Sequence, residues 1–296
     1  MNCKLCPRGC GAKREHGNTG FCGETKNIRI ARAALHMWEE PCISGEGGSG
    51  TVFFTGCTLR CVYCQNHTIS TGDVGKEITV ERLAQIFLEL QEKKANNINL
   101  VTPTHFVPQI IQAIDMAREY GLHLPIVYNT SGYESIETLK MLEGYVDVYL
   151  PDFKYLSSEH AKKYSMAADY PDIAKAAIAE MVRQTKAPEF DSRGMMTKGV
   201  IVRHLLLPGC LKDAKQIVSY LYSTYGNQIY MSLMNQYTPL GTLDKEKYPE
   251  LNRKVLESVY DKLVDYAIEL GVEQAFIQEG DTAEESFIPP FTLEGV

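Results

Sequence analysis

The stretch TVFFTGCTLRCVYCQN, residues 51–66, contains the features that decide the fold of this chain. Its first five residues are β-branched or aromatic and predict a buried strand at 51–55. Cys57, Cys61 and Cys64 follow directly, in a C-x3-C-x2-C spacing on one short loop. Three thiolates from a single loop can ligate three irons of a [4Fe–4S] cube, and the fourth iron then keeps an open coordination position. An open iron can bind a substrate, so this loop is the first candidate for a catalytic site.

Two other interpretations of these cysteines remain, a zinc site and ordinary buried thiols. Zinc requires a fourth ligand, which His67 would supply. The strand that precedes the loop and the pattern that follows it both favour an iron–sulfur cluster over either alternative.

Beyond the loop, short apolar runs alternate with longer stretches of helical periodicity, which is typical of βα units on a parallel sheet. Strands are predicted at 51–55, 97–101, 125–129, 146–150, 199–206 and 228–233, with a seventh at 274–278. Helices are predicted at 79–94, 108–120, 135–142, 174–186, 211–225 and 251–270. Six or seven units are too few for a closed eight-stranded barrel. The expected fold is therefore α/β, a partial (βα)6 TIM-like barrel, and a doubly wound open sheet is the competing architecture.

The first fifty residues differ from the rest and are expected to form a small Cys-rich extension, so that residues 1–50 bind metal and residues 51–296 form the barrel. They contain a β-prone run at 28–37 and a Gly-rich run, SGEGGSG at 44–50, which is expected to be flexible. A second group of cysteines has the spacing C-x2-C-x3-C-x11-C and predicts a metal site, either structural zinc or an auxiliary [4Fe–4S] cluster. Its members are Cys3, Cys6, Cys10 and Cys22. The alternative is that these cysteines are free thiols in a loosely structured N-terminal segment, which is called the head below.

Composition limits the classes of partner and the compartment. The formal net charge is −7 and no run of Lys or Arg forms a phosphate-binding stripe, so nucleic acid is not expected as a partner. No signal peptide and no apolar segment of ~20 residues is visible, so a cytoplasmic protein without a membrane anchor is expected. Seven of the nine cysteines fall into the two clusters, which favours metal ligation over disulfides.

The loop at 56–66 resembles the defining motif of the radical SAM superfamily, and the chain is most similar to the branch that resembles pyruvate formate-lyase activating enzymes. The similarity covers nearly the whole chain, through EPCISGEGGSGTVFFTGCTLRCVYCQN, NLVTPTHF, YLPDFKY, VRHLLLPG and MSLMNQYTP. It implies that a [4Fe–4S] cluster on Cys57, Cys61 and Cys64 binds S-adenosylmethionine (SAM) and cleaves it reductively to a 5′-deoxyadenosyl radical. The radical would abstract a hydrogen atom from a substrate, such as a glycine of a glycyl-radical enzyme. Reduced flavodoxin or ferredoxin is the implied electron donor.

The resemblance also assigns SAM contacts, with one departure. The well-studied activating enzymes have a Gly-Gly-Glu element that receives the methionyl amine, whereas this chain has Val-Thr-Pro-Thr at 101–104. The implied contacts are Tyr63 to adenine, Thr102 and Thr104 to the amine in place of the glutamate, and Asn129 and Ser131 to the ribose. Asp152 and Lys154 are assigned to the methionyl end or the substrate backbone, Arg203 to the ribose or carboxylate, and Gln236 to the region after the sixth strand.

Several candidates and alternatives stay open at this stage. His36, Glu39 and Glu40 form a candidate substrate-facing group, and His105 and His204 are candidates to line a cavity, although packed core residues are the more ordinary interpretation. Glu284 and Glu285 are expected in a solvated tail. The alternative functions are radical modification of another peptide or of a small molecule, and a non-catalytic iron–sulfur protein for electron transfer or binding. The sequence does not identify the substrate, a catalytic residue, the metal in the head, the oligomeric state or a part for Cys210 in catalysis.

Overall fold

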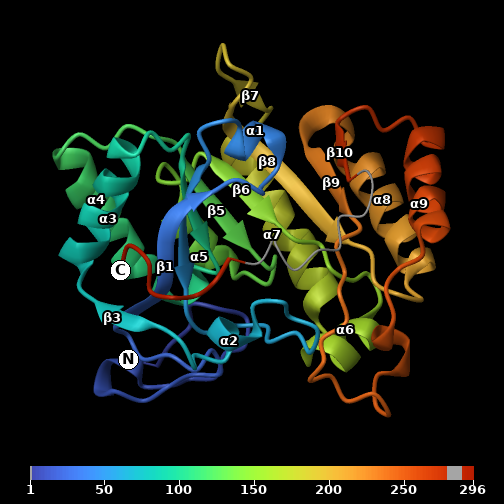
Figure 1. Ribbon diagram of the computed structural model, residues 1–296, viewed down its shortest axis with the longest axis horizontal. Helices are drawn as coiled ribbons and strands as arrows, with labels where there is room; N and C mark the ends of the chain where they lie inside the picture. Colours follow the sequence, from blue (N-terminus) through green and yellow to red (C-terminus); the bar gives the residue numbers. More distant parts are fainter. Residues whose placement is uncertain (1, 279–288) are drawn as a thin grey trace.

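A computed structural model of the chain describes residues 2–278 and 289–296, so Glu284 and Glu285 lie outside the described residues. Its centre is one ten-stranded sheet (Figure 1). The strands are β1 Ile28–His36, β2 Ser49–Phe54, β3 Lys76–Ile78, β4 Ile98–Val101, β5 Ile126–Thr130, β6 Val148–Pro151, β7 Glu189–Phe190, β8 Met196–Leu205, β9 Tyr230–Met234 and β10 Ala275–Ile277.

The sheet has the topology of a partial barrel. From one end to the other the order is β10-β9-β8-β6-β5-β4-β2-β1-β3, and β7 pairs with β8. All neighbours from β2 to β10 are parallel, whereas β1 pairs antiparallel with both β2 and β3. The parallel strands follow one another without a reversal of order, as in a barrel and unlike a doubly wound sheet. The predicted fold class is confirmed, and each of the seven predicted strands overlaps one of these parallel strands.

Helices flank the sheet at both ends in the view of Figure 1, with α3 and α4 beside one end and α8 and α9 beside the other. The helices are α1 Pro41–Ser44, α2 His67–Ser70, α3 Val80–Glu92, α4 Val107–Glu119, α5 Ile136–Met141, α6 Ser158–Ser165, α7 Tyr170–Thr185, α8 Leu211–Tyr225 and α9 Glu257–Glu269. Side-chain caps begin three of them, because Thr79, Ser135 and Ser157 each accept a hydrogen bond from the backbone N–H three residues later.

The short helices α1 and α2 were not predicted, and three longer helices also differ from the sequence-based prediction. Helix α7 begins four residues before the predicted start, because Pro171 is compatible with a first helical turn. The final helix begins at Glu257, since residues 249–252 form a separate 3-10 turn that ends in extended backbone at Arg253. Helix α6 was not predicted, because Ala161 and Tyr164 are its only clearly apolar buried residues.

The interior of the barrel is filled by helix α1. Successive strand residues point to opposite faces, so Val127 and Val148 face inward while Tyr128 and Tyr149 face the outer helices. The inward cluster consists of Cys42, Ile43, Val127, Val148, Leu150, Met196 and Ile201. The chain leaves β1, places α1 inside the barrel and returns to enter β2. Helix α1, which is called the plug below, forms the floor beneath the carboxyl ends of the strands.

The Gly-rich run at 44–50 was wrongly expected to be flexible. Ser44 ends α1, while Ser49 and Gly50 already belong to β2 and are buried. Gly45 and Gly48 have φ values of +49° and +80°, a region that favours glycine, and a Cβ on Gly48 would lie 2.7 Å from the Met37 sulfur. The glycines allow a tight return from the plug to the sheet.

Strand β1 precedes residue 50 but belongs to the same sheet, so two parts of the N-terminal region lie outside the sheet, residues 2–27 and residues 37–48 around α1. The functional division at residue 50 stays a prediction. None of the described helices has the length and apolar character that crossing a bilayer would require.

Candidate functional site

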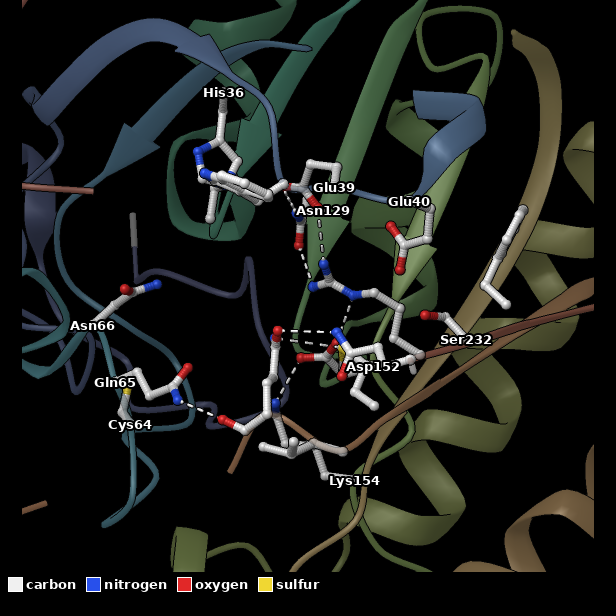
Figure 2. Close-up of a pocket in the computed structure, with 18 of the residues that line it drawn as sticks. His36, Glu39, Glu40, Cys64, Gln65, Asn66, Asn129, Asp152, Lys154 and Ser232 are labelled. Carbon is white, nitrogen blue, oxygen red and sulfur yellow. Dashed lines mark hydrogen bonds and ion pairs between the residues drawn. The ribbon is translucent and has the colours of Figure 1, made fainter. Parts of the chain in front are cut away.

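A cavity of about 590 Å³ lies at the carboxyl ends of the parallel strands, above the plug (Figure 2). Three segments line it: the cysteine loop, the strand ends and residues 36–41 between β1 and α1. Of the residues predicted from the sequence, the structure brings together here Cys61, Tyr63, Cys64, Asn129, Asp152, Lys154, Arg203 and Gln236, with His36, Glu39 and Glu40. Active sites of barrels form at this edge.

The cysteine loop follows β2 and presents the thiols of Cys61 and Cys64 to one side of the cavity. The sulfur of Cys57 accepts hydrogen bonds from the N–H groups of Leu59 and Arg60, at 3.3 and 3.4 Å, and Ser165 donates to the sulfur of Cys61 at 3.0 Å. Such donors stabilise thiolates and tune iron–sulfur clusters. Burial, with Cys57 and Cys61 beside it, raises the pKa of Cys64 to about 12. Metal binding must therefore displace a proton from this thiol.

This donor set fits a cluster held by three cysteines. All three thiols are free of disulfides, and Cys61 and Cys64 are exposed to the cavity. Across residues 2–278 and 289–296, no group of three or more His, Cys, Asp or Glu side chains is arranged to hold a single metal ion.

Tyr63 is buried between the cysteine loop and the cavity. Tyr155 donates a hydrogen bond to its hydroxyl at 2.6 Å, and its ring lies edge to face with those of Tyr155, Tyr164 and Tyr237. These contacts fix the ring next to Cys64, and the contact with adenine predicted for Tyr63 stays a prediction.

Arg203 is the centre of a charged network across the cavity (Figure 2). Its guanidinium donates to Asp152 at 2.9 Å, to Glu39 at 3.2 Å and to Asn129 at 2.6 Å. Lys154 donates to the other oxygen of Asp152 at 2.6 Å. Burial opposes ionisation of Asp152, but Arg203 and Lys154 outweigh it and lower the pKa of this carboxyl. Asp152 and Lys154 are therefore charged at neutral pH, whereas burial raises the pKa of Glu39.

Thr102, Thr104 and Ser131 are not among the described residues that line the cavity. Thr104 donates instead to the buried Glu134 at 2.6 Å. Burial raises the pKa of Glu134 to about 7, although hydrogen bonds from Thr104, Thr130 and Tyr128 oppose the shift. The backbone oxygen of Ser131 accepts from Tyr170. The roles predicted for the three residues in SAM binding stay predictions.

Three further candidates also lie outside the described lining. His105 and His204 are buried and held against the backbone, at 2.7 Å from the oxygen of Thr55 and 2.8 Å from that of Phe153. Cys210 is buried beside His160, 4.0 Å from its Nδ1. Each contact is that of a packed core residue.

Sequence reasoning missed Ser232, which lines the cavity, and Asn99, which contacts the cavity residue Glu39 from behind the lining. Asn99 donates to Glu39 at 3.0 Å, and the hydroxyl of Ser232 lies beside Glu40. Each is a buried polar residue within an otherwise apolar strand, INLV and YMSLM. A polar residue at an inward position was the signal that could have identified them.

The Cys-rich head packs directly on the cysteine loop. Arg8 donates to the backbone oxygens of Thr58 at 2.8 Å and Leu59 at 3.2 Å, and its guanidinium lies 4.0 Å from the centre of the Phe21 ring. The N–H of Cys57 donates to the oxygen of Cys22 at 3.2 Å. A Cβ on Gly56, which has φ of +76°, would lie 2.5 Å from that oxygen, so glycine is required at the contact.

The four head cysteines lie near one another. A Cβ on Gly20 would lie 3.2 Å from the sulfur of Cys10 and 3.5 Å from that of Cys22. Burial raises the pKa of Cys6 to about 12, and the neighbouring Cys22 and Cys3 add to the shift. The second metal site stays a prediction.

Comparison with known proteins supports the sequence resemblance. An uncharacterized protein of Methanocaldococcus jannaschii is 28% identical over 90% of this chain and 74% of its own length. A pyruvate formate-lyase-activating enzyme of Clostridium pasteurianum is 25% identical over 71% of this chain and 82% of its own. The structure of HydG, a maturase of the [FeFe]-hydrogenase, superimposes with a TM-score of 0.53 at 14% identity, over 78% of this chain but only 52% of the maturase, and this likeness concerns the fold alone. The family model described as "Radical SAM superfamily" matches residues 51–187, and this part of the chain is a domain of that superfamily.

Proposed function

We propose that the protein is an enzyme that cleaves SAM reductively and uses the resulting 5′-deoxyadenosyl radical to abstract a hydrogen atom from a substrate. One observation carries the proposal: Cys61 and Cys64 line the same cavity as the charged network of Asp152, Lys154 and Arg203. The superfamily match of residues 51–187 supports it. A cluster on the loop and a charged cosubstrate in the cavity would then be adjacent.

In this proposal Cys57, Cys61 and Cys64 hold the [4Fe–4S] cluster, which together with bound SAM would supply the one-electron chemistry. Lys154 and Asp152 present opposite charges 2.6 Å apart, which suits the amine and carboxylate of a methionyl group. Tyr63 offers its ring to the adenine. Asn129, Arg203 and Gln236 line the space that remains for the ribose and the substrate.

For the substrate, we propose a glycine of a partner protein, with reduced flavodoxin or ferredoxin as the electron donor. The relative named pyruvate formate-lyase-activating enzyme supports this choice. Modification of another peptide or of a small molecule is the alternative that the same cavity serves.

The proposal is tested with full-length protein that has been reconstituted with iron and sulfide, reduced, and supplied with SAM. We expect 5′-deoxyadenosine and methionine in equal amounts, and none when the reductant is omitted. Reduced protein with a full complement of cluster iron that produces no 5′-deoxyadenosine would leave a non-catalytic iron–sulfur protein as the function.

We also propose that Cys3, Cys6, Cys10 and Cys22 form the second site, for zinc or for an auxiliary cluster. Their proximity and their connection to the cysteine loop through Cys22 support it. A head of this size has little apolar core of its own, and a metal would compensate for that.

Replacing the four head cysteines with serine should remove one metal equivalent and spare the cluster on Cys57, Cys61 and Cys64. Zinc and iron are measured on protein purified anaerobically, next to a Cys210→Ser variant, which is expected to keep its full metal content. If the wild type contains neither zinc nor iron beyond the first cluster, the second site does not exist.

A further inference from the structure

Glu39 and Glu40 are adjacent in the chain but differ in how their carboxylates are satisfied. Glu39 is fully engaged: one oxygen accepts from Asn99 at 3.0 Å and Asn129 at 3.2 Å, and the other pairs with Arg203 at 3.2 Å. Glu40 is 8% exposed, and its Oε2 is buried without a hydrogen-bond partner among the residues that the structure describes. The cavity therefore contains one carboxylate oxygen with unused capacity.

The position of Glu40 is set by the plug. Its backbone oxygen accepts from the N–H groups of Ile43 and Ser44 at 2.7 and 3.0 Å, which fixes the residue at the start of α1. A buried acceptor that is left without a hydrogen-bond partner destabilises the folded state, and it does so most when the acceptor is charged. Such a group in a native structure requires an explanation, and here the side chain lines a cavity large enough for a ligand.

The charges around the cavity indicate which ligand would satisfy this oxygen. Three carboxylates line it, Glu39, Glu40 and Asp152, against two cations, Lys154 and Arg203. Burial lowers the pKa of His36, which also lines the cavity, to about 4, so it is neutral at pH 7. The groups that face Glu40 are Ser232, Glu39 and Arg203, and Arg203 already donates to Asp152, Glu39 and Asn129. Burial raises the pKa of both Glu39 and Glu40, and a cation bound beside Glu40 would favour the charged form of its carboxyl.

Glu40 also lies apart from the cysteine loop. Figure 2 shows it near Ser232 and away from Lys154 and Cys64. Near this part of the cavity, Met37 and Trp38 provide apolar surface and are 46% and 59% exposed. An alkyl chain could pass along these side chains and reach the carboxylate with a charged end.

We propose that Glu40 binds a cationic group of the substrate, an ammonium or a guanidinium at the end of an alkyl stem. This inference deepens the proposed function, on which it rests, by naming the class of group that the substrate presents. A lysine-like or arginine-like side chain of a peptide and a small alkylamine share this chemistry.

The test uses n-butylammonium and n-butylguanidinium as probes, 1-pentanol as the neutral analogue, and the full-length protein without reductant or SAM. Ligand-detected NMR titration gives the dissociation constants. For the wild type we expect at least about tenfold tighter binding of the cations than of the alcohol, and Glu40→Gln should remove this preference. Glu40→Asp keeps the charge and should retain most of it. Glu46→Gln, an equal change at an exposed position, should leave it unaltered.

Two results would overturn the assignment: no preference for cations in the wild type, or an unchanged preference in Glu40→Gln. A further measurement tests whether Glu40 binds a cation of the substrate or the sulfonium of SAM. It compares the affinities of SAM and S-adenosylhomocysteine, because SAM carries a sulfonium charge that S-adenosylhomocysteine lacks. The ratio of their affinities should be the same in the wild type and in Glu40→Gln. If the variant weakens SAM selectively, the cation that Glu40 meets is the sulfonium, and the substrate assignment is wrong. The probe titration needs no radical chemistry, so its failure is distinct from a failure of SAM cleavage.

Discussion

Replacing Cys57, Cys61 or Cys64 with alanine is expected to reduce SAM cleavage to the background rate while the barrel remains folded. Each cysteine supplies one of only three protein ligands to the proposed cluster, and a cube held by two thiolates loses its anchorage. The three residues lie on a loop after β2, outside the inward cluster that includes Cys42 and Ile43. Loss of the ligands should therefore leave the strands and the plug in place.

The measurements are cluster absorbance, iron content, 5′-deoxyadenosine formation and far-ultraviolet circular dichroism on reconstituted protein. Cys210→Ala is the matched control, because it removes a buried thiol that does not line the cavity, and it should keep its cluster and its SAM cleavage. A triple alanine variant that still produces 5′-deoxyadenosine would refute the assignment of the cluster.

Replacing Arg203 with methionine should cause the largest loss of stability among single substitutions in the cavity. The side chain is 15% exposed and is shared between Glu39, 9% exposed, and Asp152, 16% exposed. Removing one partner of a buried ionic group leaves uncompensated charge, which typically costs about 3–5 kcal/mol. Lys154 still balances Asp152, so the main penalty should come from Glu39, which retains only the amides of Asn99 and Asn129.

Urea unfolding at neutral pH measures the effect. The control is Arg193→Met, which breaks an ion pair with Asp191 between side chains that are 65% and 27% exposed and should change the midpoint little. Adding Glu39→Gln to Arg203→Met should recover part of the lost stability, because it removes the uncompensated charge. Equal unfolding midpoints for the wild type and Arg203→Met would mean that the network does not stabilise the fold.

The strands were predicted well from the sequence. A buried parallel strand is a short, nearly continuous apolar run, and few other segments of the chain have this pattern. Runs such as PIVYN and GVIVRHLLL predict β5 and β8 with an error of a few residues. Helices that lie half in solvent were harder. Helix α6 has the sequence SEHAKKYS, which lacks the apolar stripe that identifies a helix, and it is stabilised by packing against α7 and the cysteine loop.

The positions of individual site residues were predicted with mixed success. Asp152, Lys154 and Arg203 were assigned to the site, and the structure joins all three in one network. The role expected for Thr104, in place of a missing glutamate, stays a prediction, and in the structure Thr104 donates to Glu134 thirty residues further along the chain. The hydroxyl of a threonine in a loop has no local feature that distinguishes a contact with a ligand from a contact with a buried carboxylate.

By itself, the sequence determined the elements that depend on residues close together in the chain. The three-cysteine loop falls within eleven residues, and the strand that presents it and the alternation of strands and helices are equally local. Only the tertiary structure determined which residues line the cavity and which of them contact one another. The contact of Glu39 with Arg203 spans 164 residues, and the plug places Glu40 inside the barrel although its segment precedes the first parallel strand. Whether a buried carboxylate finds a partner depends on which strands surround it, and that is set by the packing of the whole sheet.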